Sequence, residues 1–392
     1  MTQLDLTGLT AEPAQVWGGI RLVPLVRETP ITDLRLRRDL FTDAWMAVEP
    51  GDGSYYASYI PHGFVADWAR DGKWQAAYGT QLCDEYDQPD DTPVHAIPMR
   101  RLVQRAGSRR LRFLPLHLAL EGYLALHFGG PSVLWEEWAK RAVSRGLSPR
   151  AEMAYVGASV EGLDEALRIF EIHPGQCGVM VYTADALAAA FVVPHPDDYR
   201  ALHSSLLQDL YGELVYQHAY YSPPVREFTA VIEDARVSDL AGLRSAALGQ
   251  LDAWAEDHDR HLAGGLLDES YEITQLRRMG AAGRYRLSRF LPPFALHREQ
   301  HIGETITDLK GRVAYLKSMR LSENQVRRGH LLSQLARYDW NLEDTAAALG
   351  SSPVELVRRI RSAGFDGLLK RHVVEAAQRG RWDGRPSSRQ GG

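Results

Sequence analysis

Three arginines near the C-terminus are the residues with the clearest chemical use in this sequence. Arg358, Arg359 and Arg361 are close together, and guanidinium groups bind phosphates through charge-assisted hydrogen bonds. Polar residues lie just before them. The predicted nucleic-acid contacts are Ser351, Ser352, Glu355, Arg358, Arg359 and Arg361. Pro353 has no N–H to offer a base, and Glu355 repels phosphate unless it accepts from a cytosine amino group. The pattern therefore favours phosphate contact over strong base readout.

Three helical patterns would position these arginines. Leu331–Leu335 supplies the apolar face of the first helix, and Asn341 is a suitable cap for a short second helix. Gly350 can take the positive φ that a tight turn needs. Ser352 caps a third helix, and Pro353 stands at its first position, where proline is well tolerated. We expect Leu356 and Ile360 to face inward, which leaves the arginines largely outward.

This stretch of about 35 residues resembles the helix-turn-helix of Fis-type DNA-binding proteins. The matching positions are Asn341, Ala346-Ala347, Leu349-Gly350, Arg358-Arg359, Ile360 and Gly364. The resemblance implies that the third helix enters the major groove of duplex DNA, usually in a dimer. The sequence departs from the family at Ser352-Pro353 and Glu355, where a polar or basic pair is usual. A trihelical unit that only packs on the body or on another chain is the alternative.

Other residues that could do chemistry have simpler interpretations. His297 and His301 are four apart and precede Glu304, so on a helix they could share a face, but their order matches no metalloprotease signature. His258 and His261 suit the end of a helix. We therefore predict hydrogen bonding rather than metal binding for these histidines.

The remaining motifs indicate no catalytic site. Cys177 lies in an apolar run and reads as a buried small side chain, whereas Cys83 stands beside the acidic loop 84–91, which disfavours its thiolate. No nucleophile elbow or phosphate-binding glycine loop occurs. The tryptophans and tyrosines between residues 17 and 78 could stack a base, but core packing is the default. No catalytic residue, metal or cofactor is predicted.

The charge of the chain is divided unevenly. The whole sequence has 45 Lys and Arg against 50 Asp and Glu. Residues 301–392 hold 16 basic and 10 acidic residues, a net of +6, which leaves −11 for residues 1–300. A basic C-terminal quarter on an acidic body permits DNA contact. Two cysteines and no visible secretory signal lead us to expect a cytoplasmic protein.

The body reads as a mixture of strands and helices. Short apolar runs separated by Gly, Pro and Asp predict a β meander or barrel over residues 14–114. Helices are expected at 131–145, 156–171, 196–218 and 238–257, a hairpin at 177–193, and strands at 271–276 and 284–290. A further helix is expected from Arg298 to about Met319.

Part of the body resembles the bacterial ARPP domains, which are associated with ADP-ribosylglycohydrolase and rhodanese-phosphatase genes. The match is best over 152–221, around His173-Pro174-Gly175-Gln176-Cys177-Gly178-Val179, and the opening strand Trp17–Leu25 is also similar. The resemblance implies a place in nucleotide- or ADP-ribose-linked stress or defence systems, by gene association alone.

Together these observations predict an α+β protein with a β-rich N-terminal region, a mixed α/β middle and an all-helical C-terminal module. The expected units are an acidic body (1–297), a connecting helical segment (298–330), the helix-turn-helix (331–370) and a basic disordered tail (371–392). The favoured function is a non-enzymatic DNA-binding regulator, forming a homo-oligomer without a membrane partner. The alternatives are an assembly component that uses the helices for protein contacts and, third, a nucleotide-processing enzyme.

Overall fold

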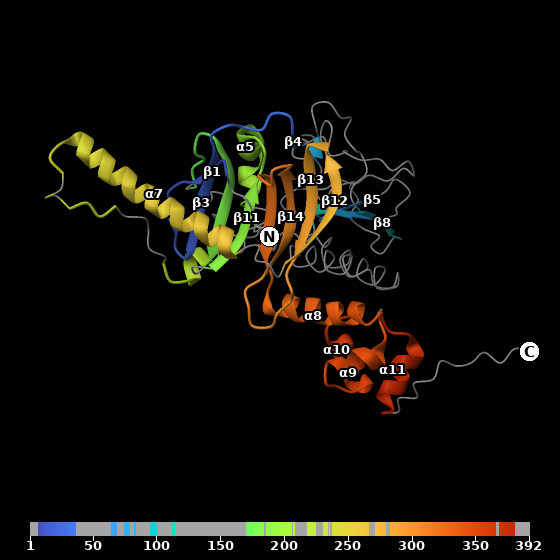
Figure 1. Ribbon diagram of the computed structural model, residues 1–392. Helices are drawn as coiled ribbons and strands as arrows, with labels where there is room; N and C mark the ends of the chain where they lie inside the picture. Colours follow the sequence, from blue (N-terminus) through green and yellow to red (C-terminus); the bar gives the residue numbers. More distant parts are fainter. Residues whose placement is uncertain are drawn as a thin grey trace, which may run out of the picture.

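The computed structural model describes residues 7–36, 64–68, 74–78, 82–83, 95–99, 112–113, 170–183, 186–205, 207, 218–224, 230–233, 235, 237–265, 271–279, 283–365 and 368–380. Within them the chain is a mixed α+β protein, as predicted, built on a large antiparallel sheet with helices on both of its faces (Figure 1). A group of short helices follows beyond one end of the sheet.

The main sheet has nine strands among the described residues, in the order β1-β3-β10-β11-β15-β14-β13-β12, with β2 paired to β3. Its strands are β1 (Leu9–Ala11), β2 (Gln15–Trp17), β3 (Ile20–Arg27), β10 (Gln176–Thr183), β11 (Ala186–Val192), β12 (Glu272–Met279), β13 (Tyr285–Leu291), β14 (His301–Asp308) and β15 (Val313–Arg320). The central strands are buried on both sides because helices cover both faces. Every residue of β10 is buried, for example.

Short strands from the predicted meander form two smaller sheets. β4 (Arg35–Leu36) pairs with β7 (Leu82–Cys83). The strands β5 (Phe64–Trp68), β6 (Trp74–Tyr78), β8 (His95–Met99) and β9 (Arg112–Phe113) pair in the order β8-β6-β5-β9. The predicted strands 64–68 and 74–78 are confirmed. The helix expected at 131–145, the acidic loop 84–91 and residues 156–169 of the helix expected at 156–171 lie outside the described residues, and residues 170 and 171 are not helical.

A different helix covers each face of the main sheet. On one face, Tyr199 and Leu202 of α5 (Pro196–Ser205) are fully buried in a cluster with Val181 and Phe191. On the other face, Trp254 of α7 (Leu240–Gly265) packs on a second apolar cluster. The N-terminal half of α7 projects beyond the sheet (Figure 1). Both helices begin where capping and proline patterns predicted them to begin.

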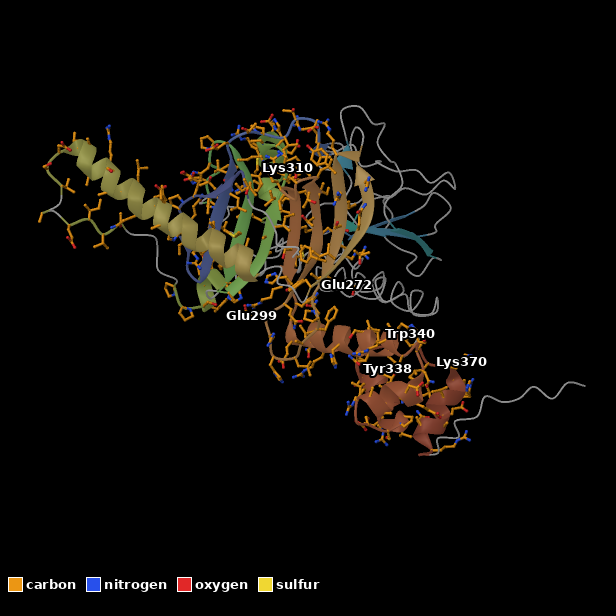
Figure 2. The ribbon with its side chains drawn as sticks, in the orientation of Figure 1. Glu272, Glu299, Lys310, Tyr338, Trp340 and Lys370 are labelled. Atoms are coloured by element: carbon orange, nitrogen blue, oxygen red, sulfur yellow. The ribbon has the colours of Figure 1, made fainter. Side chains whose placement is uncertain are left out.

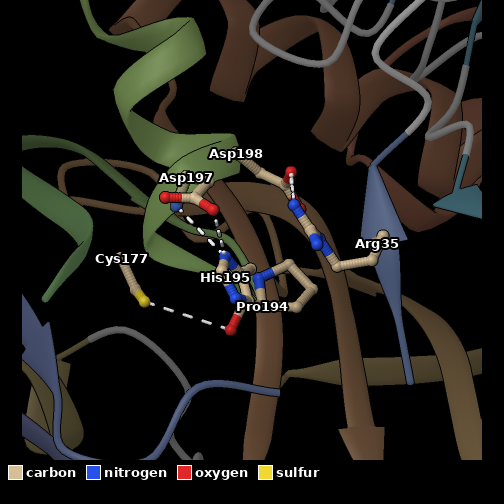
Figure 3. A network of polar contacts seen from close by, with 6 residues as sticks. All are labelled: Arg35, Cys177, Pro194, His195, Asp197 and Asp198. Atoms are coloured by element: carbon tan, nitrogen blue, oxygen red, sulfur yellow. Dashed lines mark hydrogen bonds and ion pairs between the residues drawn. The ribbon is translucent and has the colours of Figure 1, made fainter. Parts of the chain in front are cut away.

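Residues 28–36 form a crossing segment, which runs over one end of the sheet and contacts α5 and the end of β11. Arg35 makes two hydrogen bonds to the buried carboxylate of Asp198 in α5, at 2.9 and 2.8 Å (Figure 3). The N–H of Ile31 donates to the carbonyl of Pro194 at 3.1 Å. Beside this contact the Sγ of Cys177 lies 4.0 Å from the same carbonyl oxygen, so Cys177 is the buried side chain that its apolar run predicted.

The helix predicted from Arg298 to Met319 is wrong, because the chain forms the hairpin β14–β15 there. The two strands are buried on both faces, so the alternation of apolar and polar residues that marks a half-buried strand is missing. Gly311, with φ of 90°, makes the turn between them. The strands predicted at 271–276 and 284–290 and the hairpin at 177–193 are confirmed as β12, β13 and β10–β11.

The C-terminal helices are α8 (Glu323–Arg337), α9 (Leu342–Ala348), α10 (Pro353–Ser362) and α11 (Arg371–Gln378). Helix α8 begins in a capping box, in which Ser322 and Gln325 satisfy each other's backbone N–H groups. Its Gly329 faces the ring of Phe294, and a Cβ there would lie 2.2 Å from a ring carbon, so the helix can approach the body closely. Helix α11 lies where a disordered tail was predicted to begin; its Val373, Val374 and Ala377 have an apolar pattern that was overlooked.

Candidate nucleic-acid interface

The start of α10 is built from local signals. Gly350 has a φ of 59° in the turn that follows α9, a conformation that favours glycine. The Oγ of Ser352 accepts a hydrogen bond from the N–H of Glu355 at 3.2 Å, and Pro353 occupies the first turn. These contacts satisfy the helix N-terminus and set the direction in which α10 leaves the turn.

The buried side of α10 fixes which residues remain outside. Leu356, Val357 and Ile360 are buried in α10, and Leu356 and Ile360 share a cluster with residues of α8 and α9. The side chains of Arg358 and Arg359 are 70% and 50% exposed, and Arg361 is exposed as well. The arginines therefore lie on the outward side that the helical period predicted for them.

Glu355 moderates the charge of this surface. Its two carboxylate oxygens lie 3.6 Å from Nη1 of Arg358 and 3.6 Å from Nε of Arg359. Pairs this exposed contribute little to stability. They do place a negative charge beside the two arginines, so a phosphate must compete with Glu355 for them.

Most of the basic charge of the C-terminal quarter lies beyond α10. Residues 323–365 contain six Lys and Arg against five Asp and Glu, a net of +1, whereas residues 368–392 contain six against two, a net of +4. The net charge of +6 in residues 301–392 is thus not concentrated on α10. A nucleic acid bound at α10 would need charge from the residues after α11 to gain strong electrostatic attraction.

The turn between α8 and α9 has an unusual backbone. Asp339 and Trp340 both have positive φ, 49° and 62°, and Trp340 packs against the main apolar cluster. Tyr338 and Trp340 belong to this turn, and Lys370 precedes α11 (Figure 2). The N–H groups of Glu343 and Asp344 donate to Asn341 Oδ1, which confirms Asn341 as the cap of α9.

The histidines that were considered as metal ligands are not brought together. His301 and Glu304 lie in β14, where residues three apart point to opposite faces. His301 is buried with its Nδ1 3.1 Å from Ser318 Oγ, whereas His297 is exposed. Within the described chain no group of three His, Cys, Asp or Glu side chains could hold a metal ion. The side chains of His258 and His261 lie outside that part.

A row of buried charges on the main sheet was missed by the sequence reasoning. Arg289, Glu304 and Lys317 are direct neighbours on β13, β14 and β15, and Lys317 Nζ lies 3.7 Å from Glu304 Oε2. Burial lowers the pKa of Lys317 from its ordinary value, while Glu304 opposes that shift. The sequence shows the charged residues Glu304 and Lys317. Because a helix was predicted there, their pairing across two strands could not be seen.

Comparison with known proteins places the body in a family. The model of the ARPP-2 family matches residues 4–280, which includes β1 to β12 and leaves β13 to β15 and the helices α8 to α11 outside the match. No curated protein and no solved structure matches the chain. Of the helices in the described residues, none is long and apolar enough to cross a bilayer. Since the match spans well over half of the sequence, the chain belongs to the ARPP-2 family.

Proposed function

We propose that helices α8 to α10 form a Fis-type helix-turn-helix that binds duplex DNA, and that the ARPP-2 region senses or binds a partner. The observation that carries the proposal is the division of α10, with Leu356 and Ile360 buried and three arginines outside. A helix held in this way can present guanidinium groups to phosphates without losing its packing.

The proposed contacts are Ser351, Ser352, Glu355, Arg358, Arg359 and Arg361. Because Pro353 and Glu355 stand at the start of α10, we infer that binding depends mainly on phosphates and discriminates weakly between sequences. A single short helix contacts few base pairs, so the proposed binding form is a homo-oligomer.

The test is fluorescence anisotropy of the full chain with a labelled duplex over a salt series. We expect affinity to fall steeply with salt, and Arg358→Gln with Arg359→Gln to reduce the slope of log K against log salt by about 2, since each lost phosphate contact removes roughly 0.9. The control is Arg284→Gln with Arg312→Gln, which removes the same charge at the far end of the sheet from side chains that are each 51% exposed.

Two results would contradict DNA binding by α10. One is wild-type protein that shows no salt-dependent binding of duplex DNA. The other is a slope that is unchanged in the α10 double variant and lost when Arg381, Arg385 and Arg389 are replaced by Gln, because the contact would then lie outside α10.

A second candidate function is protein assembly in a stress or defence system. It is favoured by the two ion pairs from Glu355, which partly neutralise Arg358 and Arg359. Light scattering distinguishes the two functions. A stable oligomer that persists in the α10 double variant, together with no DNA binding, supports assembly; a monomer at all concentrations argues against it.

A further inference from the structure

A cavity of about 340 Å³ lies under the crossing segment at one end of the main sheet. Its walls come from the end of β3, the crossing segment, the start of β13 and the turn of β14–β15. The charged and phenolic residues that line it are Arg27, Glu28, Asp33, Tyr285, Asp308 and Arg312. Lys310 marks this turn, at the end of the sheet opposite Tyr338, Trp340 and Lys370 (Figure 2). The cavity is therefore remote from α10.

Two of the three carboxylates at the cavity already have partners. Asp33 accepts from the hydroxyl of Tyr285 at 2.7 Å and lies 2.6 Å from a guanidinium nitrogen of Arg284. Asp308 accepts from Nε of Arg312 at 2.7 Å and from the backbone N–H of Lys310 at 2.8 Å. These contacts balance both carboxylates locally, so neither serves as a counterion for the remaining guanidinium group.

That remaining group is Arg27, at the base of the cavity. Arg27 is only 6% exposed, and its Nη2 donates to the carbonyl oxygen of Val313 at 2.9 Å. Its Nε is buried without a hydrogen-bond partner. Among the described residues, no carboxylate lies within ion-pair distance of it. A guanidinium has five N–H donors, and the contacts of Arg27 are the bond to Val313 and a hydrogen bond with the Cys177 thiol, so donors remain for a ligand.

The nearest titratable side chain cannot balance this charge. Cys177 lies beside Arg27, but burial raises the pKa of its thiol to about 11, so the thiol is neutral at pH 7. Burial also lowers the pKa of Arg27 from its ordinary value, yet an arginine remains protonated at neutral pH. A buried cation without a counterion is costly unless an anion completes the site.

We propose that this cavity binds the oxyanion group, a phosphate or a carboxylate, of a small molecule. Arg27 holds the oxyanion at the base, where a planar guanidinium can bind two oxygens at once. Arg312 of the β14–β15 turn, which is paired with Asp308, offers further N–H donors, and the aromatic ring of Tyr285 supplies an apolar wall. The volume suits a small molecule, and the position of the cavity at the far end of the sheet separates it from the proposed DNA contact (Figure 2).

The experiment is titration calorimetry of the full chain with inorganic phosphate and, separately, with succinate, at constant ionic strength. We expect saturable binding of at least one probe. Tighter phosphate binding identifies a phosphorylated ligand, and tighter succinate binding identifies a carboxylate ligand. Arg27→Gln should weaken binding by about tenfold or more, since it removes a charge-assisted contact.

If Arg27→Gln fails to fold, other variants still test the proposal. Arg312→Gln should weaken binding severalfold, although its side chain is 51% exposed. Arg327→Gln should leave binding unchanged, because this 58% exposed side chain pairs with Glu323 on α8, at the opposite end of the sheet (Figure 1). The double variant Arg358→Gln, Arg359→Gln should bind the probe as the wild type does. The proposal is overturned if neither probe binds at 10 mM (on the order of the weakest measurable affinity), if Arg327→Gln is as harmful as Arg312→Gln, or if the α10 variant abolishes binding.

Discussion

At the scale of single residues, burial determines how the polar side chains of the main sheet behave. His301 illustrates this because it lies in a strand that is buried on both faces. Burial, assisted by the charge of Arg320, lowers the pKa of His301 from 6.5 to about 4. The imidazole is therefore neutral in the folded protein at pH values where it would be charged in the unfolded chain.

This pKa shift predicts a loss of stability in mild acid. Between about pH 6.5 and pH 4 the unfolded chain binds a proton that folded His301 does not, so the free energy of unfolding falls by up to about 3 kcal/mol. Urea denaturation at pH 7 and pH 4.5 measures the fall, and His301→Gln should reduce it by about 2 kcal/mol. The buried His203, whose pKa burial also lowers, contributes in the same direction and remains in the variant. An unchanged fall in His301→Gln would contradict this origin.

The sequence located residues well where the signal was local. Ser352, Gly350 and the apolar pair Leu356 and Ile360 predicted the orientation of the three arginines, because capping and helical period act within a few residues. Arg27 could not be recognised as part of a site. Its partner Val313 is 286 residues away, and no pattern within one strand records that separation.

At the scale of elements, the turn between α9 and α10 depends on one glycine. Gly350 has positive φ, and no atom lies near the position where a Cβ would stand. Gly350→Ala should therefore lower the free energy of unfolding by about 1 kcal/mol through backbone strain alone. The control is Gly249→Ala in α7, which also has open space and no positive φ; it should raise stability by up to about 1 kcal/mol. Thermal denaturation of both variants measures the two changes in stability. If both variants were stabilised, or both destabilised, backbone strain at position 350 would not explain the result.

The prediction of a helix over residues 298–319 failed because burial on both faces removed the alternation of polar and apolar residues that marks a strand. In β14 and β15 nearly every residue is buried, so the period of two is absent, and the polar residues His301, Glu304 and Lys317 resemble the exposed side of a helix. The β10–β11 hairpin was predictable despite similar burial. Its apolar run begins after Gly175, and its only acidic residue, Asp185, stands between the two strands.

At the scale of the whole molecule, α8 lies in one apolar cluster that the sheet and the C-terminal helices share. Val326 and Leu332 share one apolar cluster with Ile302 and Met319 of the sheet and with Leu356 of α10. We infer that the body and the C-terminal helices unfold together rather than as independent units, because no break in the core separates them.

The contact between Gly329 and Phe294 tests this coupling. Gly329→Ala places a Cβ against the buried ring of Phe294, so it should lower the free energy of unfolding by about 1–3 kcal/mol. Phe294→Leu with Gly329→Ala should cost less than the sum of the two single changes, since the smaller side chain leaves room for the Cβ. Calorimetry of the variants measures the costs and the number of transitions. Strict additivity, or a separate transition for the helices in the wild type, would contradict the shared core.

The position of β3 in the sheet has a consequence for the order in which the chain can fold during synthesis. β3 ends at Arg27, its neighbour β10 begins at Gln176, and the carbonyl that Arg27 binds belongs to Val313. A ribosome needs on the order of 7–30 s to make the chain between β3 and β10. Of the strands that pair with β3 in the described chain, β1 and β2 exist during that interval and β10 does not. The nascent apolar strand Ile20–Arg27 therefore has to be kept from intermolecular pairing until β10 has been made.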